Sequence, residues 1–285
     1  MENTIKSFSV PSRRTILIIL GMVLFLPPLN IIPQAVGEVN LCGRVCPRLF
    51  LILSPKGIIP GGLANIQAMW FGAVLVGAVL GITLLFGRFW CGHLCPIGGF
   101  SEMVSRGLPG RIKINFSGID APAFRYGYLA VFIAGAYVGL GSIACKLCNY
   151  RVTPYLLGLP FEPAYRAYFS TSLGMAGLLT MTATGFLAKG GRAYCNFLCP
   201  LGALDSLVNG FRQRLRFIKK VNTDPSRCVG CGQCLEACPV RALKVDHDQN
   251  GKGRTLKRDH FSCLSCRECV QACPEGANYY GKTLE

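Results

Sequence analysis

The chain has 285 residues and a formal net charge of +16; 51% of its residues are hydrophobic and only 15% are charged. Soluble domains usually carry about 25% charged residues, so this composition predicts an α-helical membrane protein and argues against an ordinary soluble domain. The chain also contains 16 cysteines, yet its long apolar stretches exclude a secreted disulfide scaffold, because such scaffolds are short.

Four stretches without a charged residue predict four transmembrane helices in a membrane domain that covers residues 15–208. Each stretch can hold a helix of about 20 residues, which is enough to cross the hydrocarbon core of a bilayer. Buried helices of a soluble protein are the less favoured alternative. The four stretches are 15–37, 57–87, 126–144 and 167–188.

The orientation expected in the membrane follows from the lysines and arginines beside these stretches. The N-terminal segment 1–14 contains Arg13 and Arg14, which fit a twin-arginine export signal. An uncleaved first span is favoured, since no clear small-residue cleavage site follows. Basic residues are more frequent at the N-terminus, in the second connection and on the C-terminal side than in the first and third connections. A multi-pass protein of the bacterial inner membrane is therefore predicted, with both termini in the cytoplasm.

The membrane domain consists of two similar units, about 15–110 and 122–208. RFWCGHLCPIG (88–98) and RAYCNFLCPLG (192–202) occupy corresponding places in the two units, and each contains the motif C-x3-C-P. Because each unit would cross the membrane twice, the units are expected to be parallel repeats. The repeat divides eight cysteines into a cytoplasmic-face set and a periplasmic-face set. The cytoplasmic-face set is Cys91, Cys95, Cys195 and Cys199, and the periplasmic-face set is Cys42, Cys46, Cys145 and Cys148.

Each set has the four thiolates that an iron–sulfur cluster needs. For the cytoplasmic-face set there are two interpretations. Either the four cysteines bind one shared cluster, or each C-x3-C-P motif is a helix-capping turn or a redox-active thiol pair. For the periplasmic-face set, a cluster competes with two disulfides, Cys42–Cys46 and Cys145–Cys148, because the periplasm is oxidising.

Three titratable residues close to the C-x3-C-P motifs are candidate proton acceptors. His93 lies between Cys91 and Cys95, whereas Glu102 and Asp205 each follow a motif by a few residues. A polar residue at the interface is the favoured interpretation for His93, and a solvated carboxylate for the other two, so the catalytic residues stay unknown. Haem is not expected, because no C-x-x-C-H run occurs and none of the three histidines lies in a predicted span.

The segment 209–222 is expected to link the membrane domain to a C-terminal domain. Its sequence NGFRQRLRFIKK (209–220) interleaves apolar and basic residues, which is typical of an amphipathic segment on anionic lipid. Binding of nucleic acid is disfavoured, because the rest of the tail is nearly balanced in charge.

Residues 223–285 are predicted to form an α+β ferredoxin domain with two [4Fe-4S] clusters. CVGCGQCLEACP (228–239) and CLSCRECVQACP (263–274) are complete C-x2-C-x2-C-x3-C-P runs, and in two-cluster ferredoxins the fourth cysteine of each run binds the other cluster. Zinc is disfavoured by the spacing. Cluster one is assigned to Cys228, Cys231, Cys234 and Cys273, and cluster two to Cys263, Cys266, Cys269 and Cys238.

The two C-x3-C-P motifs followed by two ferredoxin runs resemble the membrane ferredoxin-type family that includes NapH and MauN. The resemblance extends more distantly to the membrane part of NosR. For NapH-like members it implies a quinol dehydrogenase subunit that passes electrons to a periplasmic enzyme through another iron–sulfur or cytochrome c-type protein. For MauN-like members it implies a maturation factor that supplies redox equivalents for cofactor assembly in a periplasmic enzyme of the methylamine dehydrogenase type. An electron-transfer protein with two [4Fe-4S] clusters, and one or two further clusters at the remaining cysteines, is expected.

Overall fold

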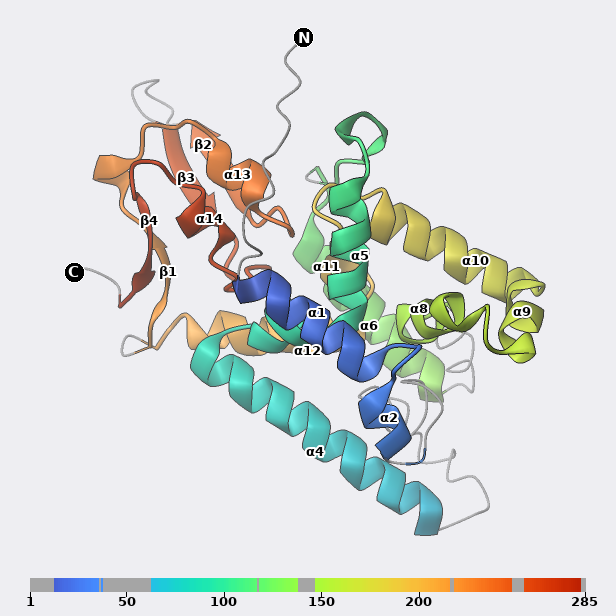
Figure 1. Ribbon diagram of the computed structural model, residues 1–285. Helices are drawn as coiled ribbons and strands as arrows, with labels where there is room; N and C mark the ends of the chain where they lie inside the picture. The colour runs from blue at the N-terminus through green and yellow to red at the C-terminus, as the bar shows by residue number, and fades with distance from the viewer. Residues whose placement is uncertain are drawn as a thin grey trace.

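The computed structural model describes residues 13–35, 37, 63–116, 118–137, 147–215, 218–247 and 254–282 (Figure 1). The helical part contains α1 (Arg13–Phe25), α2 (Ile31–Ala35), α4 (Leu63–Phe86), η1 (Trp90–Leu94), α5 (Pro96–Gly107), η2 (Gly110–Ile112), α6 (Ala121–Tyr137), α8 (Asn149–Gly158), α9 (Pro163–Phe169), α10 (Ser172–Met181), η3 (Thr182–Phe186), α11 (Ala193–Phe197) and α12 (Pro200–Arg212). The C-terminal part contains β1 (Lys220–Thr223), η4 (Pro225–Arg227), α13 (Gln233–Ala237), β2 (Leu243–His247), β3 (Arg254–Arg258), α14 (Glu268–Gln271) and β4 (Asn278–Gly281).

The prediction of four transmembrane helices is wrong. In the part of the chain that the structure describes, no helix has both the length and the apolar character that a membrane crossing requires. The first charge-free stretch is divided between α1, with 13 residues, and α2, with 5; Pro27 and Pro28 lie between them, and proline interrupts helical hydrogen bonding. In the fourth stretch α10 has only 10 residues before η3 begins. The multi-pass location in a bacterial inner membrane depended on those spans and is contradicted by the same finding.

The helices of the N-terminal part pack around the two segments that carry the C-x3-C-P motifs. α1 lies against α5 and η1, α4 lies against α12, and α6 contacts both α11 and α12. Gly21 allows the close approach of α1, because a Cβ at this position would collide with the carbonyl of Leu94. Both motifs end in a helix that starts with proline, α5 at Pro96 and α12 at Pro200, where the missing N–H costs no helical hydrogen bond.

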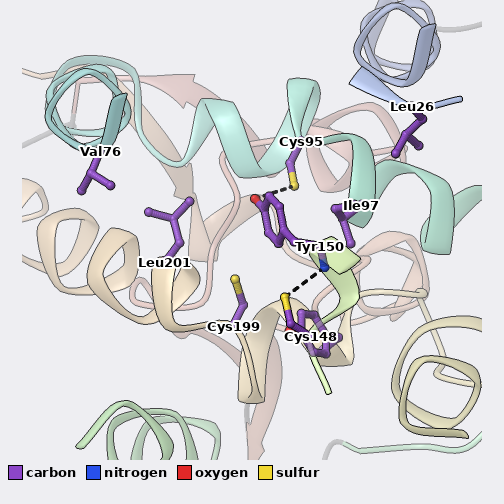
Figure 2. Packing of buried hydrophobic residues seen from close by; sticks show 9 residues of the cluster. Leu26, Val76, Cys95, Ile97, Cys148, Tyr150, Cys199 and Leu201 are labelled. Atoms are coloured by element: carbon purple, nitrogen blue, oxygen red, sulfur yellow. Dashed lines mark hydrogen bonds between the residues drawn. The ribbon is translucent and has the colours of Figure 1, made fainter. Parts of the chain in front are cut away.

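One apolar cluster joins the two motifs. It includes Leu26 just after α1, Val76 of α4, Ile97 of α5 and Leu201 of α12, all nearly inaccessible to solvent (Figure 2). Leu201 and Ile97 hold the same place in the two motifs, two residues after the last cysteine. The repeated sequence therefore supplies matching apolar side chains to a shared core.

The C-terminal part consists of two short antiparallel β-ribbons and two short helices. β1 pairs with β4, with Val221 opposite Tyr280, and β2 pairs with β3, with Val245 opposite Leu256. α13 and α14 pack against each other. This arrangement agrees with the ferredoxin-type domain expected from the sequence.

Two buried ion pairs cross between the repeat units. Arg88 precedes the first motif and donates from Nε to Oδ2 of Asp205 on α12, at 2.9 Å. Arg192 precedes the second motif and donates from Nε to Oε2 of Glu102 on α5, at 2.6 Å. All four side chains are at most 1% exposed. Each unit thus supplies the carboxylate that neutralises the arginine of the other.

We expect Asp205→Ala to lower the free energy of unfolding by about 3–5 kcal/mol, because it leaves the guanidinium of Arg88 buried without its carboxylate. The matched control is Glu236→Ala, which removes a surface pair with Arg241 from a side chain that is 77% exposed and should cost less than about 1 kcal/mol. Urea unfolding of the complete chain, followed by circular dichroism, measures both. Equal effects of the two substitutions would contradict the dominant role of the buried pair.

Candidate iron–sulfur sites

The four residues assigned to cluster one line a single pocket. Cys228, Cys231 and Cys234 come from the first ferredoxin run, and Cys273 is the last cysteine of the second run. Cys231 is exposed, and the neighbouring Val229 is 68% exposed. The chain therefore brings together the residues expected from the crossed ligand pattern, at the surface of the domain.

The four residues assigned to cluster two gather in the interior of the domain. Cys238 and Cys269 belong to one buried apolar core, and Cys263 and Cys266 pack against it. Burial raises the pKa of Cys238 to about 11, and the pKa of Cys266 to about 12 despite the nearby Arg14. Binding of iron would have to displace these protons, since the thiolate is the metal ligand.

The two ferredoxin runs share one backbone conformation. Gly230 and Gly232 have φ values of 70° and 78°, and the corresponding residues of the second run, Ser265 and Arg267, have φ values of 53° and 62°. Residues other than glycine rarely adopt positive φ. The second run therefore keeps the same strained turns without glycine, which indicates that the cysteine geometry requires them.

The four cysteines of the C-x3-C-P motifs, which we call the C-x3-C-P quartet, are all buried: Cys91, Cys95, Cys195 and Cys199. They lie close enough to influence one another electrostatically: Cys91 is affected by Cys95 and Cys199, and Cys195 by the same two residues. The structure thus brings together the cytoplasmic-face set of the sequence analysis, from two motifs a hundred residues apart.

Burial raises the pKa of Cys195 to about 12, and the negative charge of Cys95 and Cys199 acts in the same direction, while Arg192 opposes it. Burial likewise raises the pKa of Cys91, with Asp205 adding to the shift and Arg88 opposing it. Cys91 and Cys195 would therefore stay protonated without a cation. Iron supplies such a cation, and thiolate is its usual protein ligand in iron–sulfur clusters.

Two features around the quartet fit an iron–sulfur cluster. Nη2 of Arg192 is buried and has no hydrogen-bond partner among the described residues. A Cβ on Gly98 would lie 3.1 Å from Sγ of Cys195, so glycine keeps the space beside this sulfur open. In the described ranges no three cysteine, histidine or carboxylate side chains converge as they would on a single metal ion. Ligands of a four-iron cluster are spread around a larger body.

Cys148 lies beside the quartet. It belongs to the same apolar core as Cys95 and Cys199. Tyr150 contacts two of these cysteines: its backbone N–H donates to Sγ of Cys148 at 3.1 Å, and its hydroxyl lies 3.7 Å from Sγ of Cys95 (Figure 2). The sequence analysis placed Cys148 in a separate periplasmic-face set. Its other members, Cys42, Cys46 and Cys145, lie outside the described residues.

The three candidate proton acceptors have different surroundings from those expected. Glu102 and Asp205 are not solvated, because both are buried in ion pairs with arginine. Although burial opposes ionisation, Arg192 and Arg14 lower the pKa of Glu102 to about 2. Burial and the charge of Arg14 lower the pKa of His93 to about 4, and its ring stacks on Phe89 with centroids 4.5 Å apart. At neutral pH the carboxylate of Glu102 is thus ionised and the imidazole of His93 is neutral.

The quartet lies directly against the ferredoxin domain. Cys91 belongs to the same buried core as Cys238, Cys269 and Leu264. A Cβ on Gly92 would lie only 2.7 Å from the carbonyl oxygen of Leu264, so the motif and the ferredoxin backbone are in contact.

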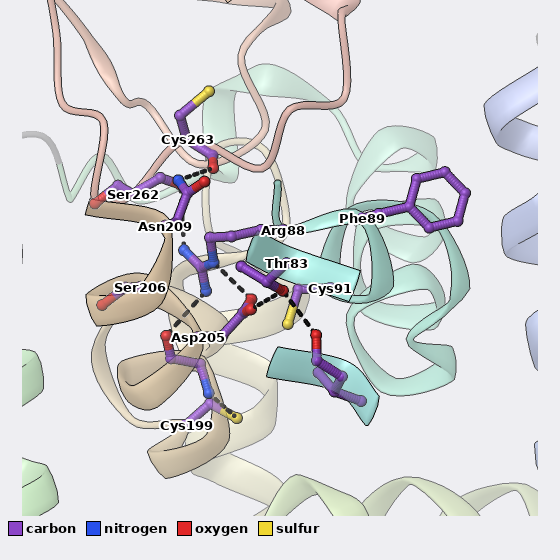
Figure 3. Close-up of polar contacts among 12 residues, drawn as sticks. Thr83, Arg88, Phe89, Cys91, Cys199, Asp205, Ser206, Asn209, Ser262 and Cys263 are labelled. Carbon is purple, nitrogen blue, oxygen red and sulfur yellow. Dashed lines mark hydrogen bonds and ion pairs between the residues drawn. The ribbon is translucent and has the colours of Figure 1, made fainter. Parts of the chain in front are cut away.

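Arginines hold this contact, and sequence reasoning missed them. The ferredoxin segment 259–266, which we call the docking loop, receives hydrogen bonds from Arg88 at the carbonyls of Phe261 and Ser262, both at 3.3 Å. Arg125 donates to Oγ of Ser262 at 2.6 Å. Asn209 of α12 donates to the carbonyl of Cys263 at 3.1 Å (Figure 3).

The basic segment expected on lipid takes part in the same interface. The guanidinium of Arg212 is buried and donates to the carbonyls of Lys219 and Leu85. A Cβ on Gly210 would collide with the ring of Phe261. The start of this segment therefore belongs to α12 and packs on protein.

The arginine three residues before the first cysteine of each motif is the sequence signal that could have revealed the buried pairs.

We expect Gly92→Ala to loosen the docking loop, because the new methyl group meets a backbone carbonyl that cannot rotate away. Amide hydrogen exchange in residues 259–266 should become faster, with the iron bound by the ferredoxin runs retained. Gly127→Ala in α6 is the control, since a Cβ there meets no atom within 4 Å, and should leave exchange in the loop unchanged. Unchanged exchange in Gly92→Ala would show that the contact does not hold the loop.

Two family models match the chain. A 4Fe-4S dicluster domain matches residues 227–277, and a 4Fe-4S binding domain matches residues 68–116 and 172–218. The second model matches both segments that contain a C-x3-C-P motif, so the duplicated unit agrees with this comparison.

Three curated relatives are 27–28% identical to this chain over the matched residues. YccM of Escherichia coli K12, whose name describes an electron transport protein, is 28% identical over 66% of this chain and 51% of its own length. The ferredoxin-type protein MauN of Paracoccus denitrificans, named for methylamine utilization, is 28% identical over 61% of this chain and 56% of its own.

The ferredoxin-type protein NapH of Haemophilus influenzae is 27% identical over 58% of this chain and 53% of its own length. The chain thus spans little more than half of these relatives, and no solved structure matches it. The two ferredoxin runs, the duplicated motif and these matches support a NapH/MauN-like family of ferredoxin-type proteins with 4Fe-4S domains.

Proposed function

We propose that this protein is an electron relay with three iron–sulfur centres in a row. The general role, iron–sulfur electron transfer, is supported by the family matches. The finer assignment is ours: cluster one at Cys228, Cys231, Cys234 and Cys273, cluster two at Cys263, Cys266, Cys269 and Cys238, and a third centre at the C-x3-C-P quartet. Bound clusters supply one-electron chemistry, and the chain's residues hold and order them.

The position of Cys91 carries this proposal. Its side chain shares one buried core with Cys238 and Cys269 of the cluster-two set. Leu264, 1% exposed, lies in that core, immediately after Cys263 in the chain. The residues of the quartet and of cluster two are thus separated by protein from which water is excluded, as an internal electron path requires.

Cluster one forms the outer end of the row. Its pocket opens beside the exposed Cys231 and Val229, whereas the residues of the quartet are at most 8% exposed. A redox partner protein can therefore approach cluster one but not the quartet. Following the family resemblance, we propose another iron–sulfur or c-type cytochrome protein as this partner and a quinol as the electron donor.

The protein purified without oxygen should contain about twelve iron atoms, four for each centre. The double substitution Cys91→Ser and Cys95→Ser should remove about four of them and leave the two ferredoxin clusters. Cys148→Ser is the matched control: this residue lies in the same core as Cys95 but belongs to none of the three centres proposed here, so the iron content should not change.

Iron and acid-labile sulfide analysis, with electron paramagnetic resonance of the reduced protein, measures these contents. About eight iron atoms in the unaltered protein would reject the third centre and shorten the proposed row. Reduction of the centres on mixing with a soluble quinol analogue tests the donor separately, and no reduction would reject the quinol.

A further inference from the structure

Two arginines hold equivalent places in the repeat units but are hydrogen-bonded differently. Arg88 is fully engaged, because Nε donates to Asp205, Nη2 donates to the carbonyl of Gly202 at 3.1 Å, and Nη1 donates to two carbonyls of the docking loop. Arg192 donates from Nε to Glu102 and from Nη1 to the carbonyl of Cys91. Its Nη2 has no partner among the described residues, although the side chain is 0% exposed.

The guanidinium of Arg192 lies beside the sulfur atoms of the quartet. A Cβ on Gly98 would be 2.6 Å from Nη1 of Arg192 and 3.1 Å from Sγ of Cys195, so the two groups flank the same small space. Cys195 and Cys95 both act electrostatically on Arg192. A buried N–H group without an acceptor is costly, and a cluster held by the quartet brings sulfide atoms beside this guanidinium as acceptors.

We propose that Arg192 donates a hydrogen bond from Nη2 to a sulfur of the iron–sulfur centre held by the C-x3-C-P quartet, and that it thereby raises the reduction potential of that centre. The inference rests on the proposed function, because it needs the third centre. Hydrogen bonds to sulfur and the net charge nearby are among the factors that set cluster potentials. A fixed cation stabilises the reduced form, which carries one more negative charge.

Glu102 acts in the opposite direction. Its carboxylate is 1% exposed and pairs with Arg192, Arg14 and Arg106, so it cancels part of the positive charge beside the centre. Removing this negative charge should make the centre easier to reduce, whereas removing the charge and the donor of Arg192 should make it harder to reduce. If the two residues only supported the fold, their substitutions would not shift the reduction potential of the centre in opposite directions.

The test is a redox titration of the complete anaerobic protein, followed by electron paramagnetic resonance. The signal of the third centre is identified by its loss in the Cys91→Ser, Cys95→Ser double variant. Arg192→Gln should shift the equilibrium of this centre at least tenfold toward the oxidised form, which is a drop of about 59 mV for one electron. Glu102→Gln should shift it toward the reduced form.

Arg192→Lys keeps the charge but loses the forked donor, so its potential should lie between those of the unaltered protein and Arg192→Gln. The potentials of the two ferredoxin clusters, taken from the same titrations, should change less than that of the third centre. Iron content is measured on every sample, which separates a shifted potential from a lost cluster.

Three results would overturn the inference. An unchanged potential in Arg192→Gln would show that the arginine does not act on the centre. Loss of the centre in both Arg192→Gln and Arg192→Lys would make the residue a support of the fold. About eight iron atoms in the unaltered protein would remove the acceptor and would also reject the third centre of the proposed function, whereas the first two results leave that function intact.

Discussion

The exchange of ion pairs between the two repeat units is the constraint on which the rest of the structure depends. Arg88 and Arg192 are completely buried, and each finds its carboxylate on the helix that follows the other motif. Burying a guanidinium is costly unless its charge and its donors are matched. Neither unit can satisfy this requirement alone, so pairing of the units brings the four cysteines of the quartet together.

The same constraint explains the glycine two residues after the proline of each C-x3-C-P motif. A Cβ on Gly98 would lie 2.6 Å from Nη1 of Arg192, and a Cβ on Gly202 would lie 3.4 Å from Nη2 of Arg88 and 2.6 Å from the carbonyl oxygen of Cys195. The spacing from cysteine to proline to glycine thus makes room for the arginine of the other unit.

Much of the candidate site could be predicted because cysteine spacing expresses local geometry. The crossed assignment Cys228, Cys231, Cys234 and Cys273 coincides with the residues that line one pocket, and the repeat paired Cys91 and Cys95 with their partners in the second unit. Apolar composition was a poor guide to the helices. Pro27 and Pro28 are visible in the sequence as an interruption of the first stretch, but a charge-free stretch does not show that its apolar side chains pack on protein, as Val76 does.

The buried charges could not be predicted for a related reason. Glu102 and Asp205 have the spacing of residues on exposed helix faces, and their partners are about 90 and 117 residues away in the chain. Hydropathy treats such residues as solvated, and only the tertiary structure shows the matching arginine.

The two repeat units differ in the hydrogen bonds of their equivalent arginines. Both units have an arginine in the same position, but among the described contacts Arg88 donates hydrogen bonds to the ferredoxin domain and Arg192 does not. Arg88 uses its remaining donors on the carbonyls of Phe261 and Ser262, so it fixes the docking loop relative to the quartet. The guanidinium of Arg192 lies beside Cys195, and its Nη2 has no partner among the described residues. Two arginines in equivalent places therefore differ in their contacts: Arg88 joins the repeat units to the docking loop, whereas Arg192, within the part of the chain that the structure describes, keeps an unpaired donor in the interior.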